Sequence, residues 1–308
     1  KSNKLKGYEI PGVEEKLIAT LFADDTTVYL SKDDKFSDLE DILQKWCKAS
    51  GARFNVNKTE IIPCGSEEHR VKMITERIYN PAFPKIPESI NVAREGEATR
   101  TLGGWVGNNI SEVSVWSKTL DKINESLTRW NRGHPSIRGK KHIIQMIIGG
   151  MTQYLTAVQG MPKEIEKTIV KTIKDFVWDN KRSVINIETL SLPIEKGGHG
   201  ILDVPARNEA IELVWAKRYL SLDDDRPVWA FVADVLIQRS IPKAGKNHVD
   251  ERLTINPFLQ MWKPALQGKN RVTDSLRRML KTAVKYNVNI DAIRVAEKVK
   301  MNLPAWYH

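Results

Sequence analysis

The chain has 308 residues and a formal net charge of +10, and 41% of its residues are hydrophobic. This length and apolar share are typical of a globular protein with a sizeable core and exclude an intrinsically disordered chain. No apolar run reaches the roughly 18 residues that a membrane-spanning helix needs, and no signal-peptide pattern is present. We therefore expect an intracellular protein, nuclear or cytoplasmic, with no membrane partner.

The positive charge is concentrated in one part of the chain. Residues 118–182 contain 13 Lys and Arg against 6 Asp and Glu. Such a stretch is typical of a protein that binds a polyanion such as nucleic acid, although a solvated helical surface has the same composition. The two cysteines, Cys47 and Cys64, offer no disulfide framework, which fits a reducing compartment. Cys64 and His69 lack the second ligand pair of a zinc site.

The first predicted element is a β-hairpin over residues 17–30, LIATLFADDTTVYL. Its two halves are rich in β-branched and aromatic residues, which favour strands. The turn falls at Asp24 and Asp25, because aspartate tolerates the positive φ that tight hairpin turns need.

A helix and a further strand follow the hairpin. Ser37 and Glu40 match a capping box at the start of the helix, and Gly51 can end it. Residues 53–63 return to a strand-like composition. Residues 79–104 contain six Pro and Gly, which predicts a loop with short strands and a domain boundary.

Beyond residue 115 the pattern becomes helical. Apolar residues from Trp116 to Trp130 step by four and three, which places them on one helix face. A second helix is predicted over 140–158, with Met151 and Tyr154 among its inward residues. A third begins at Pro162. These three helices predict a small bundle, followed by a glycine turn at 196–200, a helix over 207–220 and a mostly helical tail.

The placement of two adjacent carboxylates, Asp24 and Asp25, in an apolar hairpin calls for a physical explanation. Like charges repel, and burial beside an apolar hairpin makes both groups harder to ionise. A divalent cation removes the conflict, since Mg²⁺ prefers one or two carboxylates together with substrate phosphates, as in two-metal phosphoryl transfer. The plain alternative is that Asp-Asp is a common dipeptide, which recurs here at 33–34 and 223–224 among polar neighbours.

Several sequence blocks resemble one enzyme family. FADDT at 22–26 resembles the catalytic-aspartate motif of reverse transcriptases. Further blocks follow in the order found in non-LTR, LINE-type retrotransposon polymerases: ASGARFNVNKTEIIPCG at 49–65, LGGWVGNNI at 102–110, WNRG at 130–133 with SIRGKK at 136–141, FVWDNKR at 176–182, and LPIEKGGHGILDVPARNEA at 192–210. The resemblance covers residues 7–220, and the tail NLPAWYH is a weaker match.

The resemblance implies an α+β fold class, with a partial polymerase palm at 1–105, a helical thumb at 106–182 and a helical connection at 183–308. It also implies an RNA-directed DNA polymerase with Mg²⁺ as cofactor, an RNA template and a DNA primer as partners. In the family, fingers and further palm strands precede FADDT, whereas only 23 residues precede Asp24 here. We therefore expect a carboxy-terminal piece that is inactive without an amino-terminal polymerase half. The alternative is a decayed remnant that only binds nucleic acid.

The resemblance also assigns roles to residues near the acidic pair. Asp24 and Asp25 would be catalytic metal ligands. Lys58 would protonate the departing pyrophosphate, or would be an exposed strand lysine. Phe22 would face the primer terminus, or would be a core residue.

The basic stretch would hold the phosphates of the template–primer duplex at the joint between two thumb helices. The residues expected there are Arg129, Arg132, Arg138, Lys140, Lys141 and His142. Trp130 would stack on the nucleic acid, or would belong to the core as the last member of its apolar face. Lys171, Lys174, Lys181 and Arg182 either extend this track or are solvated surface.

Overall fold

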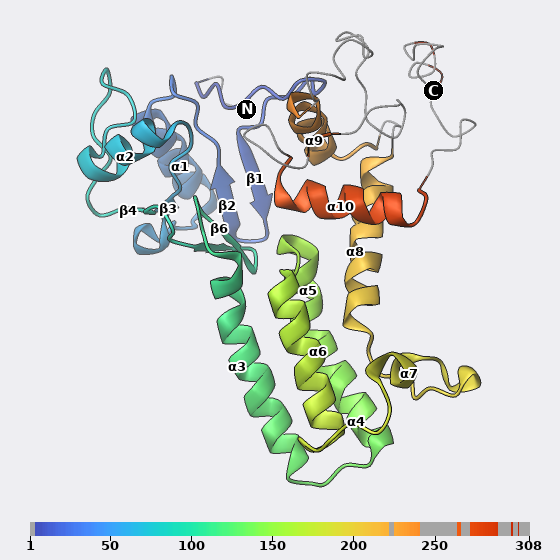
Figure 1. Cartoon of the computed structure of the whole chain (residues 1–308). Helices are drawn as coiled ribbons and strands as arrows, with labels where there is room; N and C mark the ends of the chain where they lie inside the picture. Colours follow the sequence, from blue (N-terminus) through green and yellow to red (C-terminus); the bar gives the residue numbers. More distant parts are fainter. Residues whose placement is uncertain are drawn as a thin grey trace. The chain divides into compact units, whose positions relative to one another are not determined.

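Residues 4–221, 225–240, 264–265, 272–288, 297 and 301 are described by a computed structural model (Figure 1). The chain divides into an amino-terminal unit, Lys1–Val115, and a carboxy-terminal unit, Trp116–His308. This division falls inside a helix, whereas the sequence predicted boundaries after residues 105 and 182. The weakly matching tail at 302–308 lies outside the described residues. Among the described helices, none is long and apolar enough to cross a bilayer.

The predicted hairpin is present in the amino-terminal unit. Strands β1 (Ala19–Phe22) and β2 (Asp25–Val28) pair antiparallel, and Phe22 lies opposite Asp25. Two residues, Ala23 and Asp24, close the turn. The left-handed conformation falls on Ala23, with φ of 52°, and not on an aspartate as the sequence predicted.

Four short strands complete the sheets described in this unit. β3 (Glu60–Ile61) pairs parallel with β4 (Asn91–Val92), and β5 (Thr99–Thr101) pairs antiparallel with β6 (Gly104–Val106). The strand predicted over 53–63 is therefore confined to two residues. A 3₁₀ turn, η1 (Val56–Lys58), takes up the middle of that segment.

Two helices accompany these strands. α1 (Phe36–Ser50) ends at Gly51, whose φ of 72° confirms the predicted left-handed cap. Its start was predicted wrongly: the amino-terminal cap is Lys35 with no side-chain hydrogen bond, so Ser37 lies inside the helix. α2 (Glu67–Glu76) was not predicted, although Ser66 caps it by accepting the His69 N–H.

One buried aspartate holds the amino-terminal segment to the end of the hairpin. Asp34 is 1% exposed, and its carboxylate accepts the backbone N–H groups of Lys6 at 2.5 Å, Gly7 at 3.0 Å and Ser31 at 2.8 Å. Burial alone would raise the pKa of Asp34, but these hydrogen bonds to the charged form outweigh it and lower the pKa. The apolar core of this unit is small and centres on Ile86, Ile90 and Val92.

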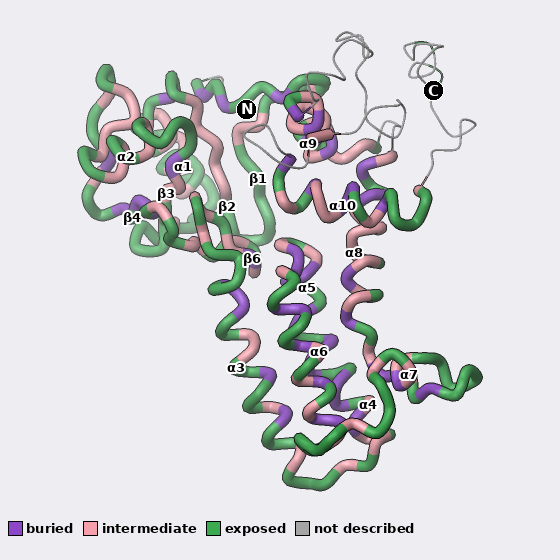
Figure 2. The backbone as a smooth tube through the Cα atoms, in the orientation of Figure 1, coloured by how far each residue is buried: buried purple, intermediate pink, exposed green. Residues whose placement is uncertain are grey.

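The carboxy-terminal unit is built from helices. In chain order they are α3 (Glu112–Asn131, which begins in the preceding unit), α4 (Ile137–Ile144), the π-helical turn η2 (Gln145–Gly149), α5 (Gly150–Gln159), α6 (Lys163–Val177), α7 (Ile187–Ser191), the 3₁₀ turn η3 (Ile194–Lys196), α8 (Val204–Tyr219), α9 (Val228–Arg239) and α10 (Asp274–Lys285). α8 packs against α5, α6 and α10, and α4 packs against α6. Figure 2 shows buried residues recurring along α4, α5 and α6.

The predicted core of the bundle is confirmed for α6 and corrected for α5. All five residues predicted inward on α6 are buried: Ile165, Ile169, Ile173, Phe176 and Val177. On α5 the predicted Leu155 is buried, but the predicted Met151 and Tyr154 are exposed, while Thr152 and Thr156 are buried. The π turn η2 inserts one extra residue per turn, so the buried face after it moves one position along the sequence.

Gly160, which ends α5, carries a testable packing constraint. Its φ is 77°, and the Arg278 guanidinium from α10 covers it while donating to the Gln159 carbonyl at 2.7 Å. A methyl group at this position would lie 2.1 Å from Arg278 Nη2. We expect Gly160→Ala to lower the free energy of unfolding by about 2 kcal/mol, because it adds left-handed strain to this clash.

Gly150 provides the matched control, because a Cβ there meets nothing within 4 Å. It lies in a helix, where alanine is favoured over glycine, so Gly150→Ala is expected to stabilise by about 0.5 kcal/mol. Urea denaturation of both variants measures the two changes. Equal effects would contradict the packing of α10 over the end of α5.

Candidate nucleic-acid interface and acidic turn

The acidic turn is solvent-exposed. Asp24 is the second turn residue and Asp25 begins β2, and both are exposed. Neither carboxylate forms a hydrogen bond or ion pair in the part of the chain that the structure describes. Their predicted burial is therefore wrong, because the hairpin is a two-stranded sheet there and the adjoining Leu21 is 74% exposed.

The two carboxylates nevertheless have the donor chemistry that Mg²⁺ prefers. They are hard oxygen ligands, adjacent in sequence and open to solvent, so they can hold a cation whose remaining positions are filled by water and phosphate oxygens. Within the described residues, no group of three or more His, Cys, Asp or Glu side chains is gathered to hold a metal ion. A magnesium ion held by these two carboxylates would need further oxygen ligands from water or a bound phosphate.

Phe22 and Lys58 lie in different kinds of local structure. Phe22 is 67% exposed at the end of β1, so the alternative that it is a core residue is wrong. Lys58 ends the 3₁₀ turn η1 and is exposed, so it is not a strand lysine. Among the described residues, no hydrogen bond or ion pair joins Lys58 to Asp24 or Asp25.

Exposed cations surround the joint between α3 and α4. We call these residues the basic cluster: Arg129, Arg132, Arg138, Lys141 and His142. All but the half-exposed Lys141 are exposed. Within the described chain their side chains make no hydrogen bond or ion pair, so they can bind phosphate oxygens. Trp130 is 47% exposed, so its assignment to the core is wrong and its ring is open for stacking.

Lys140 does not belong to the basic cluster, and the prediction that it contacts phosphate is wrong. The residue is 4% exposed, and its ammonium donates to Asp179 Oδ1 at 2.6 Å and to the Val177 carbonyl at 3.1 Å. Lysine spacing along α4 explains the difference. Lys140 lies three residues before Ile143 and four before Ile144, so it shares their inward helix face.

Four further cations lie on α6 and directly after it. Lys171, Lys174, Lys181 and Arg182 are all exposed. The first two lie on α6, opposite its buried isoleucines, and the last two follow its end. Both predicted alternatives, phosphate contact and solvated surface, require exposed side chains.

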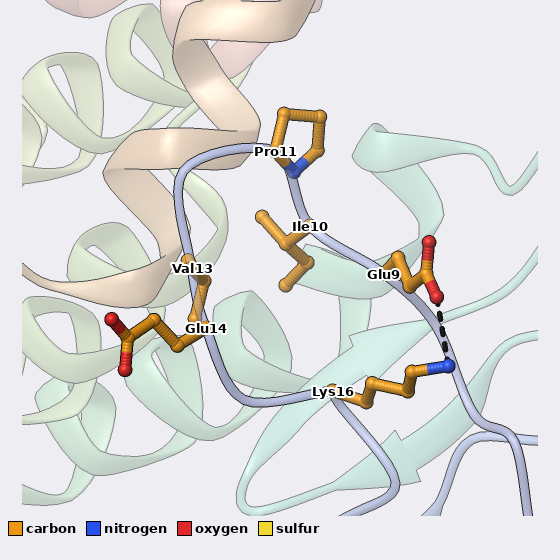
Figure 3. Close-up of a pocket in the computed structure, with 6 residues that line it drawn as sticks. All are labelled: Glu9, Ile10, Pro11, Val13, Glu14 and Lys16. Atoms are coloured by element: carbon orange, nitrogen blue, oxygen red, sulfur yellow. Dashed lines mark ion pairs between the residues drawn. The ribbon is translucent and has the colours of Figure 1, made fainter.

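A shallow pocket lies elsewhere, in the loop that precedes β1. Its lining comes from residues 9–16 alone, as Figure 3 shows. Lys16 donates to Glu9 at 2.7 Å across the loop, and this hydrogen bond lowers the pKa of Glu9. Because one loop closes on itself here, the pocket offers no set of converging groups from different elements, as an active site would.

Comparison with known proteins finds a distant similarity to a protein that is named after a transposon. No family model matches the chain. The chain is 22% identical over 234 residues, or 75% of its length, to a Xenopus laevis protein named "Transposon TX1 uncharacterized 149 kDa protein". It spans 17% of the length of that protein.

Proposed function

We propose that the chain is the carboxy-terminal part of a retrotransposon reverse transcriptase, with an α+β palm portion, a helical thumb and a helical connection. The observation that carries the proposal is the exposed Asp24-Asp25 pair at a two-residue hairpin turn. The distant similarity to a transposon protein supports a retrotransposon origin. The ordered motif blocks between residues 22 and 210 support the polymerase assignment.

In the proposed reaction, the primer 3′-hydroxyl gives its proton to water, its oxygen forms a bond to the α-phosphorus of the incoming nucleotide, and the bond from that phosphorus to pyrophosphate breaks. Asp24 and Asp25 would hold Mg²⁺, which when bound would activate the attacking oxygen and stabilise the negative charge on the leaving oxygen. The exposed ammonium of Lys58 donates a proton to the departing pyrophosphate. Phe22, exposed beside the turn, contacts the primer terminus.

A second candidate function is nucleic-acid binding without catalysis, as in a decayed remnant. The exposed, unpaired side chains of the basic cluster favour it, because phosphate contacts need accessible cations and no catalytic group. The reading frame directly upstream distinguishes the two candidates. A frame that encodes fingers and another palm aspartate supports the polymerase, and stop codons or unrelated sequence support the remnant.

Metal binding at the acidic turn is the prediction that tests the polymerase proposal. Mn²⁺ takes the same oxygen ligands as Mg²⁺ and broadens nearby NMR signals. In a chain labelled with ¹⁵N-threonine, Mn²⁺ is expected to broaden the amide signals of Thr26 and Thr27 before the other threonine signals. Asp24→Asn combined with Asp25→Asn should remove this preference.

Asp33 is the matched control, because it is also an exposed aspartate beside another aspartate. Asp33→Asn should leave the broadening of Thr26 and Thr27 unchanged. If the hairpin signals broaden no earlier than the rest, or do so equally in the double variant, the acidic turn does not bind the metal. The catalytic assignment would then be withdrawn.

A further inference from the structure

The turn after α6 has a conformation that redirects the chain sharply. Asp179 and Asn180 are both left-handed, with φ values of 49° and 60°. The Asn180 N–H donates to the Asp175 carbonyl at 2.8 Å, and the Lys181 N–H donates to the Trp178 carbonyl at 2.9 Å. Two successive left-handed residues are rare outside glycine, so neighbouring contacts must hold this turn.

Those contacts come from one buried side chain of α4. The Lys140 ammonium donates to Asp179 Oδ1 at 2.6 Å and to the Val177 carbonyl at 3.1 Å. The hydrogen bond from Lys140 lowers the pKa of Asp179. The pair of Lys140 and Asp179 therefore joins α4 to the end of α6, at one end of the bundle in Figure 1.

Both joined residues are close sequence neighbours of cations that are open to solvent. Lys140 lies two residues after Arg138 and directly before Lys141. Asp179 is followed by Asn180 and then by Lys181 and Arg182. One acidic side chain thus fixes the relative placement of the segments that carry the positive charge.

We propose that Asp179 is a positioning residue for nucleic-acid binding, which ties two cation-bearing segments, α4 and the residues after α6, into one phosphate-binding surface. This inference rests on the proposed nucleic-acid contact of the basic cluster. It extends that proposal to Asp179, although the negative charge of this residue repels the phosphates of a nucleic acid. In this proposal Asp179 contacts no nucleic acid and acts through Lys140.

The sign of the effect makes this inference testable. If Asp179 were only a negative charge near the surface, removing it would tighten binding to a polyanion. If it positions the cations, removing it weakens binding although the net charge becomes more positive. Asp179→Asn is suited to the test, because asparagine tolerates the left-handed conformation at this position.

The experiment measures fluorescence anisotropy of a labelled RNA–DNA duplex bound by the full chain, across a salt series. Asp179→Asn is expected to weaken binding about fivefold and to reduce the salt slope by about one, as for one lost phosphate contact. The control is Asp175→Asn, the same charge change one turn earlier on α6, where the side chain forms no hydrogen bond or ion pair within the part of the chain that the structure describes. It should tighten binding about twofold. Tightening by both variants would overturn the inference.

A second variant distinguishes an effect on the placement of the cations from an effect on the stability of the fold. Combining Lys140→Met with Asp179→Asn restores the wild-type net charge and removes the buried ammonium that the single change leaves unpaired. Positioning predicts that this double variant regains thermal stability and still binds weakly. Full recovery of affinity with stability would show a purely structural role and overturn the inference. If the wild-type chain itself does not bind the duplex, the proposed nucleic-acid contact fails, and the role of Asp179 fails with it.

Discussion

Replacing the four Arg and Lys residues of the basic cluster with alanine is expected to weaken binding of an RNA–DNA duplex about a hundredfold at 0.15 M salt. The physical reason is counterion release. Each cation that neutralises a duplex phosphate contributes about 0.9 to the slope of log K against log salt, so losing four contacts reduces the slope by about 3.5. Fluorescence anisotropy with the full chain measures both quantities.

The amino-terminal unit offers a control with the same loss of charge. Four exposed lysines there form no side-chain hydrogen bond or ion pair among the described residues: Lys32, Lys45, Lys48 and Lys72. Alanine at all four should change the affinity by less than about threefold, since dispersed charges act on the duplex mainly through a screened field. Equal losses for the two variants would show that net charge, and not the basic cluster, binds the duplex.

Replacing Asp34 with alanine is expected to lower the free energy of unfolding of the amino-terminal unit by about 3 kcal/mol. The change leaves three backbone N–H groups, those of Lys6, Gly7 and Ser31, without their acceptor in a buried place. Hydrogen exchange reports this directly, because the same three amides lose protection. The neighbouring Asp33 is half exposed and pairs with the Lys6 ammonium at 3.6 Å, so Asp33→Ala should cost less than about 0.5 kcal/mol.

The contribution of Asp34 depends on pH in a definite direction. Its pKa is lowered in the folded chain, so the carboxylate stabilises the fold fully above its unfolded pKa of about 3.9. This stabilisation is lost as the pH falls through the lower folded pKa. The difference between wild type and Asp34→Ala should therefore be constant near neutral pH and shrink in acid. A difference that grows in acid would contradict the assigned hydrogen bonds.

Helix periodicity predicted most of the bundle because apolar spacing is a local property of the sequence. The isoleucines of α6 recur at four-residue intervals, and all of those predicted inward are buried. The same rule misplaced two residues after η2, because a π turn changes the phase of a helix and the glycine among its five residues, Gly149, is equally compatible with an α-turn. Met151 and Tyr154 were misplaced for that reason.

The distribution of charge along the sequence predicted which segment is basic. It did not predict which of the cationic side chains in that segment are open to solvent. Lys140 and Lys141 are neighbours of identical chemistry, yet the first is buried against Asp179 and only the second is open to solvent. The distinction depends on a partner 39 residues away, which no local pattern contains. The local feature that could have indicated this partner is the pair Asp179-Asn180 shortly after the end of α6, because Asp and Asn favour left-handed turns.

The burial of the acidic dipeptides likewise could not be predicted from their neighbours in the sequence. Asp24-Asp25 was predicted to be partly buried because of its apolar neighbours, and it is exposed. Asp33-Asp34 has polar neighbours that gave no sign of burial, and Asp34 is buried and accepts three backbone hydrogen bonds. Burial of a carboxylate depends on which backbone N–H groups the fold brings to it, and here Lys6 and Gly7 come from far along the chain.

The measurement that tests the central claim most directly is the affinity of the full chain for an RNA–DNA duplex between about 50 and 200 mM salt. If the basic cluster holds phosphates without reading bases, log K should fall with log salt at a slope of at least about 3.5 in magnitude, equally for duplexes of unrelated sequence. Absence of binding at about 50 mM salt, or an affinity that does not change with salt, would contradict the proposed contact between this chain and nucleic acid.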